Sequence, residues 1–127
     1  MVTFSLGAVN GLSNGRVLLT TSNGSAHDNV LGTKVLVKDT WYHVVAVWSP
    51  VYKAIYINGI VDKDGSPSNS EIKINNLNAN IGGRGNNYQF NGLIDEVRIY
   101  NEALTSAQIQ KLYAEGVERH RIVFNEK

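Results

Sequence analysis

Cysteine is absent from this chain of 127 residues, which excludes disulfide bonds and thiolate metal sites but leaves the redox compartment open. Long apolar runs are also absent: none approaches the roughly 20 residues of a membrane-spanning helix, and the first residues do not form a signal peptide. An excess of charge of one sign is missing too, because 12 basic and 11 acidic side chains leave a formal charge of +1. We therefore expect no membrane span and no nucleic-acid partner, and an exported form would carry its signal upstream of Met1.

Short apolar stretches between turn clusters of glycine, asparagine and serine are what the chain does contain. Its 12 glycines and 43% hydrophobic residues are typical of one all-β domain with a single core. Asn58 and Gly59 favour a tight hairpin, because both residues tolerate positive φ. Residues 26–33 are predicted to form a loop, and strands are predicted at residues 2–6, 16–21, 34–37, 41–48, 54–57, 60–62, 71–74, 80–83 and 93–99.

The last of these stretches, residues 93–99, alternates in the manner of a half-buried strand. Leu93, Asp95, Val97 and Ile99 fall on one face, which places a carboxylate among apolar side chains that face inward. A buried carboxylate without a partner is costly. Asp95 therefore needs backbone donors, a cation or a position at the rim of the core.

One short helix is predicted at residues 105–115. Thr105 is a good N-cap with Gln108 three residues later, which is the pattern of a capping box. Ile109 begins an apolar stripe that is suited to docking on a sheet, and Gly116 is the expected C-terminal stop. Residues 117–127 are then a tail, in which residues 122–124 favour one more strand.

Four stretches together resemble the laminin-G-like jelly roll of the concanavalin A-like lectin/glucanase superfamily. They are residues 41–47 (WYHVVAV), 55–59 (IYING), 80–83 (NIGG) and 90–104 (FNGLIDEVRIYNEAL). The resemblance implies a two-sheet antiparallel sandwich over residues 1–116 with one short C-terminal helix. It also implies a non-catalytic module of a secreted or cell-surface bacterial protein, which binds glycans or another cell-surface ligand.

The family's usual domain has further N-terminal strands, one of which lies beside the strand that contains Asp95. The resemblance therefore implies that this chain lacks the neighbour of its last strand. An uncovered edge strand is a template for association with other chains. We expect residues 122–124, or a second copy of the chain in self-association, to cover part of this edge.

A structural calcium ion near Asp95 is also implied by the resemblance. Calcium prefers hard oxygen donors such as carboxylates and backbone carbonyls. The alternative is that the Asp95 carboxylate caps backbone N–H groups of a neighbouring loop. The sequence leaves both open.

Aromatic side chains on the stretch 41–48 are candidates for sugar binding. Trp48 and Tyr42 share one face, and an aromatic ring exposed on a concave sheet can stack on the apolar face of a sugar. The alternative is that both faces belong to the core. Trp41 is placed inside by the resemblance.

Two polar stretches are further candidates for ligand contact. The first offers hydrogen-bonding groups for a glycan, although polar loops are common in any sandwich, and contains Arg84, Asn86, Asn87 and Tyr88. The second, residues 27–29, is a ligand contact, a further calcium donor or a solvated turn.

Catalysis is not favoured by the acidic residues. Glucanases of the superfamily carry acidic residues that alternate on one strand, whereas Asp95 and Glu96 are adjacent and point to opposite faces. Serine-elbow, metalloprotease and phosphate-binding motifs are missing as well. Three hypotheses remain: a glycan- or surface-binding module, a structural or adhesion module that pairs through its open edge, and a fragment of a glycoside hydrolase.

Overall fold

The fold is a β-sandwich with a C-terminal helix, and the computed structural model describes residues 2–6, 14–84 and 88–125. Within these ranges the chain forms eight strands and one helix. The elements are β1 (Val2–Leu6), β2 (Val17–Ser22), β3 (His27–Leu31), β4 (Val44–Trp48), β5 (Lys53–Ile57), β6 (Ile60–Gly65), β7 (Gly83–Arg84), β8 (Tyr88–Gln89) and α1 (Ser106–Asn125). The all-β architecture that the sequence predicts is confirmed.

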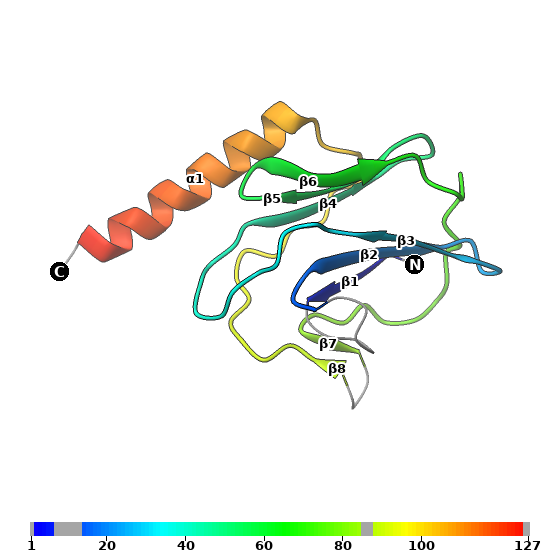
Figure 1. The fold of residues 1–127 in the computed structure, drawn as a ribbon, viewed down its shortest axis with the longest axis horizontal. Helices are drawn as coiled ribbons and strands as arrows, with labels where there is room; N and C mark the ends of the chain where they lie inside the picture. The colour runs from blue at the N-terminus through cyan, green and yellow to red at the C-terminus, as the bar shows by residue number, and fades with distance from the viewer. Residues whose placement is uncertain (1, 7–13, 85–87, 126–127) are drawn as a thin grey trace.

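The sandwich consists of two antiparallel three-stranded sheets. Their strand orders are β1-β2-β3 and β4-β5-β6, and β7 and β8 form a separate two-stranded ribbon. Figure 1 shows the two sheets stacked, with the N-terminal half of α1 along the outer side of the second sheet. The C-terminal half of α1 extends beyond the sheet, while β7 and β8 lie on the side of the first sheet.

Strand β5 is the centre of the protein, because all five of its residues are buried. On one face, Ile55 and Ile57 pack against Val17, Leu19 and Val30 of the first sheet. On the other face, residues of β4 and β5 pack against the helix, in a cluster of Val47, Ala54, Tyr56 and Ile109. The sequence predicts that residues 41–48 form a central strand with apolar residues on both faces. β4 does pack on both faces, but it lies at the edge of its sheet and β5 is the central strand.

The hairpin between β5 and β6 turns at the predicted dipeptide. Asn58 has φ 52° and Gly59 has φ 78°, so both residues occupy the left-handed region. The ring of Tyr113 from α1 packs on Gly59, where a Cβ atom would lie 3.1 Å from Cδ1 of the tyrosine. Glycine is therefore needed at position 59 both for the turn and for the close approach of the helix.

Strand β3 lies where the sequence pattern predicts a loop, so that prediction is wrong. Its residues pair with β2, with Asp28 opposite Thr21 and Val30 opposite Leu19. The strand alternates, but its polar residue Asp28 is buried at a position where an apolar side chain is usual. The inward aspartate conceals the apolar period from which a strand is recognised.

Hydrogen bonds to Asp62 join the residues that follow β3 to β6. The carboxylate of Asp62 accepts hydrogen bonds from the backbone N–H groups of Thr33 (2.8 Å) and Lys34 (2.9 Å). Gly32 leaves room for this contact, because a side chain there would collide with the Asp62 carboxylate. Asp62 thus fixes the path of the chain as it leaves the first sheet.

The strands predicted at residues 34–37, 71–74 and 93–99 are absent from the described structure, so these predictions are wrong. In residues 93–99 the chain has no strand partner within the described ranges, and Glu96 adopts φ 50°, which interrupts an extended backbone. Asp95 is consequently exposed and does not face the core. Alternation predicts how a strand would present its side chains, but it does not supply the strand beside it.

The helix begins where the sequence predicts. Thr105 N–H donates to Gln108 Oε1 (2.7 Å) and Gln108 N–H donates to Thr105 Oγ1 (3.3 Å), which is a capping box. The predicted end at Gly116 is wrong, since α1 continues to Asn125. An isolated glycine costs a helix only about 1 kcal/mol relative to alanine and does not by itself end it.

The predicted tail at residues 117–127 is therefore helical up to Asn125, and the strand expected at residues 122–124 is not formed. Within the ranges that the structure describes, no helix combines the length and the apolarity that are needed to cross a membrane.

Candidate functional site

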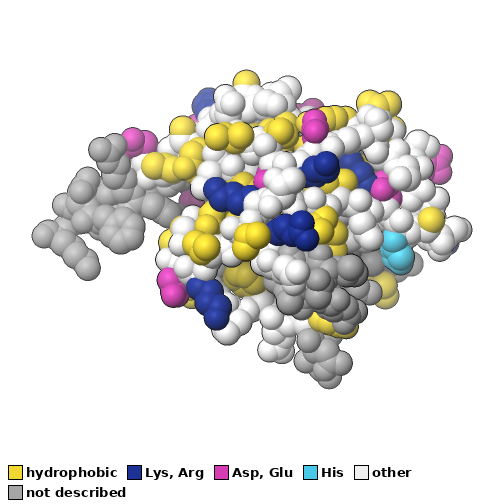
Figure 2. All heavy atoms as spheres, in the orientation of Figure 1, with side chains coloured by type: hydrophobic (Ala, Val, Ile, Leu, Met, Phe, Trp, Pro, Cys, Tyr) yellow, Lys and Arg dark blue, Asp and Glu magenta, His cyan; other side chains and the backbone are white. Residues whose placement is uncertain are grey.

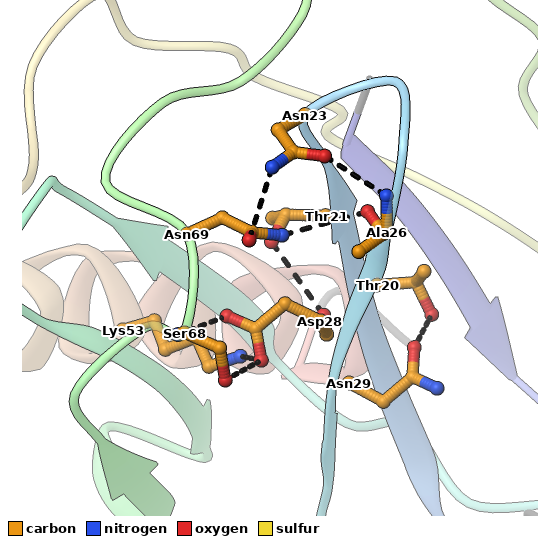
Figure 3. A network of polar contacts seen from close by, with 9 residues as sticks. All are labelled: Thr20, Thr21, Asn23, Ala26, Asp28, Asn29, Lys53, Ser68 and Asn69. Atoms are coloured by element: carbon orange, nitrogen blue, oxygen red, sulfur yellow. Dashed lines mark hydrogen bonds and ion pairs between the residues drawn. The ribbon is translucent and has the colours of Figure 1, made fainter.

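A buried ion pair joins the two sheets. Asp28 in β3 and Lys53 at the start of β5 are in contact, and their side chains are only 6% and 3% exposed. Ser68, in the loop after β6, donates its N–H to Asp28 Oδ2 (2.7 Å) and its hydroxyl to Oδ1 (3.2 Å). Figure 3 shows the carboxylate enclosed by Lys53 and Ser68, so one side chain ties together both sheets and the loop.

The protonation of Asp28 follows from these contacts. Burial raises the pKa of the carboxyl group, but the hydrogen bonds to Lys53 and Ser68 and the charge of Lys53 outweigh it. The net pKa lies below the ordinary value of 3.8, and Asp28 is ionised at neutral pH. Of the sequence hypotheses for residues 27–29, the solvated turn is wrong for Asp28, which stabilises the sandwich.

The loop that carries Ser68 is also fastened to the β2–β3 turn. Asn23 Oδ1 accepts hydrogen bonds from the N–H groups of Ser25 (3.0 Å) and Ala26 (2.9 Å), and Asn23 Nδ2 donates to Asn69 Oδ1 (3.2 Å). A shallow hollow of ≈ 110 Å³ lies beside this turn and is lined by Ser22, Gly24, His27, Lys73 and Asn75. This volume is well below the roughly 300 Å³ of ordinary small-molecule sites.

The predicted ligand residues do not converge on one surface. Trp48 ends β4 and is half-buried on the face towards the first sheet, and its indole N–H is buried with no acceptor among the described residues. Tyr42 precedes β4 and packs against the inter-sheet core, where its hydroxyl accepts a hydrogen bond from Val37 N–H (3.3 Å). The two rings therefore lie near opposite ends of one strand.

The other predicted contacts belong to the β7–β8 ribbon. Tyr88 in β8 is 44% exposed, so its ring is accessible to a ligand. Arg84 contributes to β7 through its backbone, which pairs with Tyr88. Asn86 and Asn87 lie outside the described residues. Trp41, which the resemblance places inside, is 54% exposed, so that prediction is wrong.

Asp95 does not form a cluster of carboxylates. Its Oδ1 accepts a hydrogen bond from the N–H of Glu96 (2.7 Å), the next residue in the chain, so this contact is not the cap on a neighbouring loop that the alternative hypothesis expects. In the part of the chain that the structure describes, no three His, Cys, Asp or Glu side chains are grouped so that they could hold a metal ion. Calcium takes six to eight oxygen ligands, so a site at Asp95 would draw most of them from backbone carbonyls and water.

Residues 93–100, hereafter segment 93–100, present apolar side chains to solvent. Leu93, Val97 and Ile99 are 78%, 51% and 88% exposed, and Ile94 and Tyr100 are 46% and 44% exposed. No backbone hydrogen bond joins the segment to another strand within residues 2–6, 14–84 and 88–125. The residues alternate in sequence like those of an edge strand and have no partner strand in the described ranges, although the backbone is not extended at Glu96.

An exposed ion pair links segment 93–100 to the helix. Arg119 in α1 donates to the Glu96 carboxylate (2.9 Å), and Arg98 lies 3.8 Å from the same oxygen. Further exposed apolar residues precede the segment, at Ile74, Leu77 and Ile81. Figure 2 shows hydrophobic side chains at the surface of one face of the molecule, with Lys and Arg between them.

These features define a class of protein, a two-sheet antiparallel β-sandwich module with a docked helix. The chain belongs to the concanavalin A-like lectin/glucanases superfamily, whose laminin-G-like family model matches residues 3–110. The resemblance stated from the sequence is thus confirmed. No curated protein matches the chain in sequence.

A solved structure with a similar fold is that of an S-layer domain-containing protein from Clostridium thermocellum, with 18% sequence identity and a TM-score of 0.52. The match covers 88% of the present chain and 63% of the other chain. At this identity the similarity concerns the fold alone. The comparisons therefore establish the superfamily and the fold of the chain.

Proposed function

We propose that the chain is a non-catalytic module of an extracellular or cell-surface protein that associates with a partner by accepting an extended strand. One observation carries the proposal: segment 93–100 alternates like a strand, exposes its apolar residues and has no backbone partner among the described residues. The structural neighbour is an S-layer domain-containing protein, which supports a role at the cell surface. This is the assembly hypothesis of the three that the sequence leaves open.

Strand addition suits this segment for a physical reason. A paired strand would satisfy its backbone N–H and C=O groups and would cover part of the apolar surface of Leu93, Val97 and Ile99 through cross-strand neighbours. Burying apolar area contributes about 25 cal/mol per Å². The ≈ 110 Å³ hollow, by contrast, offers little enclosed surface to a small ligand.

A synthetic peptide of alternating valine and threonine tests this function. We expect the labelled peptide to bind, with a rise in fluorescence anisotropy and with changes in NMR amide shifts confined to segment 93–100. Val97→Asp should abolish binding, because it places a charge at the centre of the apolar face. Val51→Asp is the matched control, since Val51 is 79% exposed in the β4–β5 turn and should leave binding unchanged.

The absence of binding, or equal binding by the Val97→Asp variant, would contradict the function. Glycan recognition is the second candidate, and the exposed ring of Tyr88 on the β7–β8 ribbon favours it. A glycan array distinguishes the two. If sugar binding is weaker in the Tyr88→Ala variant but unchanged in the Val97→Asp variant, the result would support the lectin hypothesis instead.

The calcium ion at Asp95 stays a prediction of the resemblance, and its test is thermal unfolding. Because one Asp95 oxygen already accepts the Glu96 N–H, we expect the same melting temperature in calcium and in chelator. The Asp95→Asn variant should likewise have the same melting temperature in calcium and in chelator. A melting temperature that rises with calcium in the natural chain, but not in the variant, would establish the ion.

A further inference from the structure

We propose that the strand accepted by segment 93–100 is the same segment of a second copy of this chain. The two segments pair antiparallel about a two-fold axis at Val97. This inference rests on the proposed strand-accepting function and names its partner.

The charge pattern of the segment selects this register. Antiparallel pairing about Val97 places Glu96 opposite Arg98 of the second copy, and the two-fold axis produces this pair twice. A register centred on Glu96 or on Arg98 brings two like charges together at the axis. Registers shifted by one residue place the apolar face of one strand beside the polar face of the other.

The apolar residues are also complementary in this register. Val97 meets Val97 at the axis on one face, and Ile94 meets Tyr100 on the other, which is a favourable pairing of an aliphatic with an aromatic side chain. Asp95 lies opposite Ile99. A two-fold contact uses the same surface on both copies, so it closes after two chains and does not propagate into a fibre.

The present conformation of Glu96 is consistent with an unpaired state. Its φ of 50° is unfavourable for a residue with a Cβ atom, and its carboxylate is engaged by Arg119 (2.9 Å) of the same chain. Pairing returns Glu96 to an extended backbone and exchanges these exposed contacts for Arg98 of the second copy. Because the ion pairs of Glu96 are exposed, they oppose this exchange only weakly.

Charge reversal measured by sedimentation velocity tests the register. We expect a concentration-dependent dimer of the natural chain, which Glu96→Arg or Arg98→Glu weakens about tenfold by placing like charges opposite each other twice. The double variant Glu96→Arg/Arg98→Glu should dimerise like the natural chain. An equimolar mixture of the two single variants should do the same, because their charges are complementary.

Arg119→Ala is the matched control, because it removes the contact of Glu96 with α1 without changing the paired segment. It should leave dimerisation intact, and circular dichroism should show that every variant is folded. A monomeric natural chain, single variants that dimerise normally, or a double variant and mixture as weak as the single variants would each overturn the register.

The outcomes separate this inference from the function on which it rests. If the valine–threonine peptide binds but the chain stays monomeric, the second copy is not the partner and the strand-accepting function stands. If the chain is monomeric and the peptide does not bind, both are wrong.

Discussion

Replacing Lys53 by alanine is expected to lower the free energy of unfolding by about 3–5 kcal/mol, which is typical when one partner of a buried ion pair is removed. The substitution leaves the ionised Asp28 enclosed between the sheets, with Ser68 as its remaining donor among the described residues. Chemical denaturation followed by tryptophan fluorescence measures the loss. The midpoint should fall while the slope of the transition stays the same.

Lys63→Ala is the matched control, because Lys63 is exposed on β6 and takes no part in the buried pair of Asp28 and Lys53. It should change the free energy of unfolding by no more than about 0.5 kcal/mol. Replacing Asp28 and Lys53 together by leucine and methionine should recover much of the lost stability, since a well-packed apolar pair carries no desolvation penalty. A Lys53→Ala protein as stable as the Lys63→Ala protein would contradict the role assigned to the ion pair.

The same contact makes part of the stability sensitive to acid. Because the folded state holds the pKa of Asp28 below 3.8, folding favours the ionised carboxylate. This contribution is complete above the unfolded pKa and is lost as the pH falls through the lower, folded pKa. Asp28→Asn should therefore flatten the fall in stability below about pH 4, where unfolded aspartate becomes protonated.

Features that depend on a few consecutive residues are predictable from the sequence. The turn at Asn58 and Gly59 needs only residues that tolerate positive φ, and the capping box needs only Thr105 and Gln108. The superfamily is predictable as well, since its pattern is spread over four stretches between residues 41 and 104. Such signals are read without knowing which segments meet in space.

Features that depend on a distant partner are not predictable in this way. Asp28 and Lys53 are separated by the whole of β4, and only the stacking of the sheets brings them together. The sequence also does not show which strand would pair with residues 93–99. These residues alternate well, but they have no partner strand in the described structure, so the predicted strand is wrong. The sequence predicts the helix end at Gly116 because glycine is a strong local helix breaker, whereas no residue after it signals that the helix continues to Asn125.

The candidate ligand residues illustrate the same limit of local reasoning. Trp48 at the end of β4 and Tyr42 just before this strand lie on the same side, as the period of two predicts, but that side faces the first sheet. An alternation with a period of two predicts which residues share a face of a strand, but it does not predict which face is covered. Segment 93–100 shows the reverse case, because its alternation predicts an inward face that the structure leaves exposed.

Ile109→Ala is expected to destabilise the protein by about 2–5 kcal/mol, because Ile109 is completely buried where α1 meets β4 and β5. The cavity would weaken the docking of α1, and with it the packing of Tyr113 on Gly59 and the contact of Arg119 with Glu96. Denaturant unfolding and hydrogen exchange of the helix amides measure both effects. Val117→Ala, at a 44% exposed position on the same helix, should cost less than about 1 kcal/mol, and a similar loss in both variants would show that Ile109 is not the anchor.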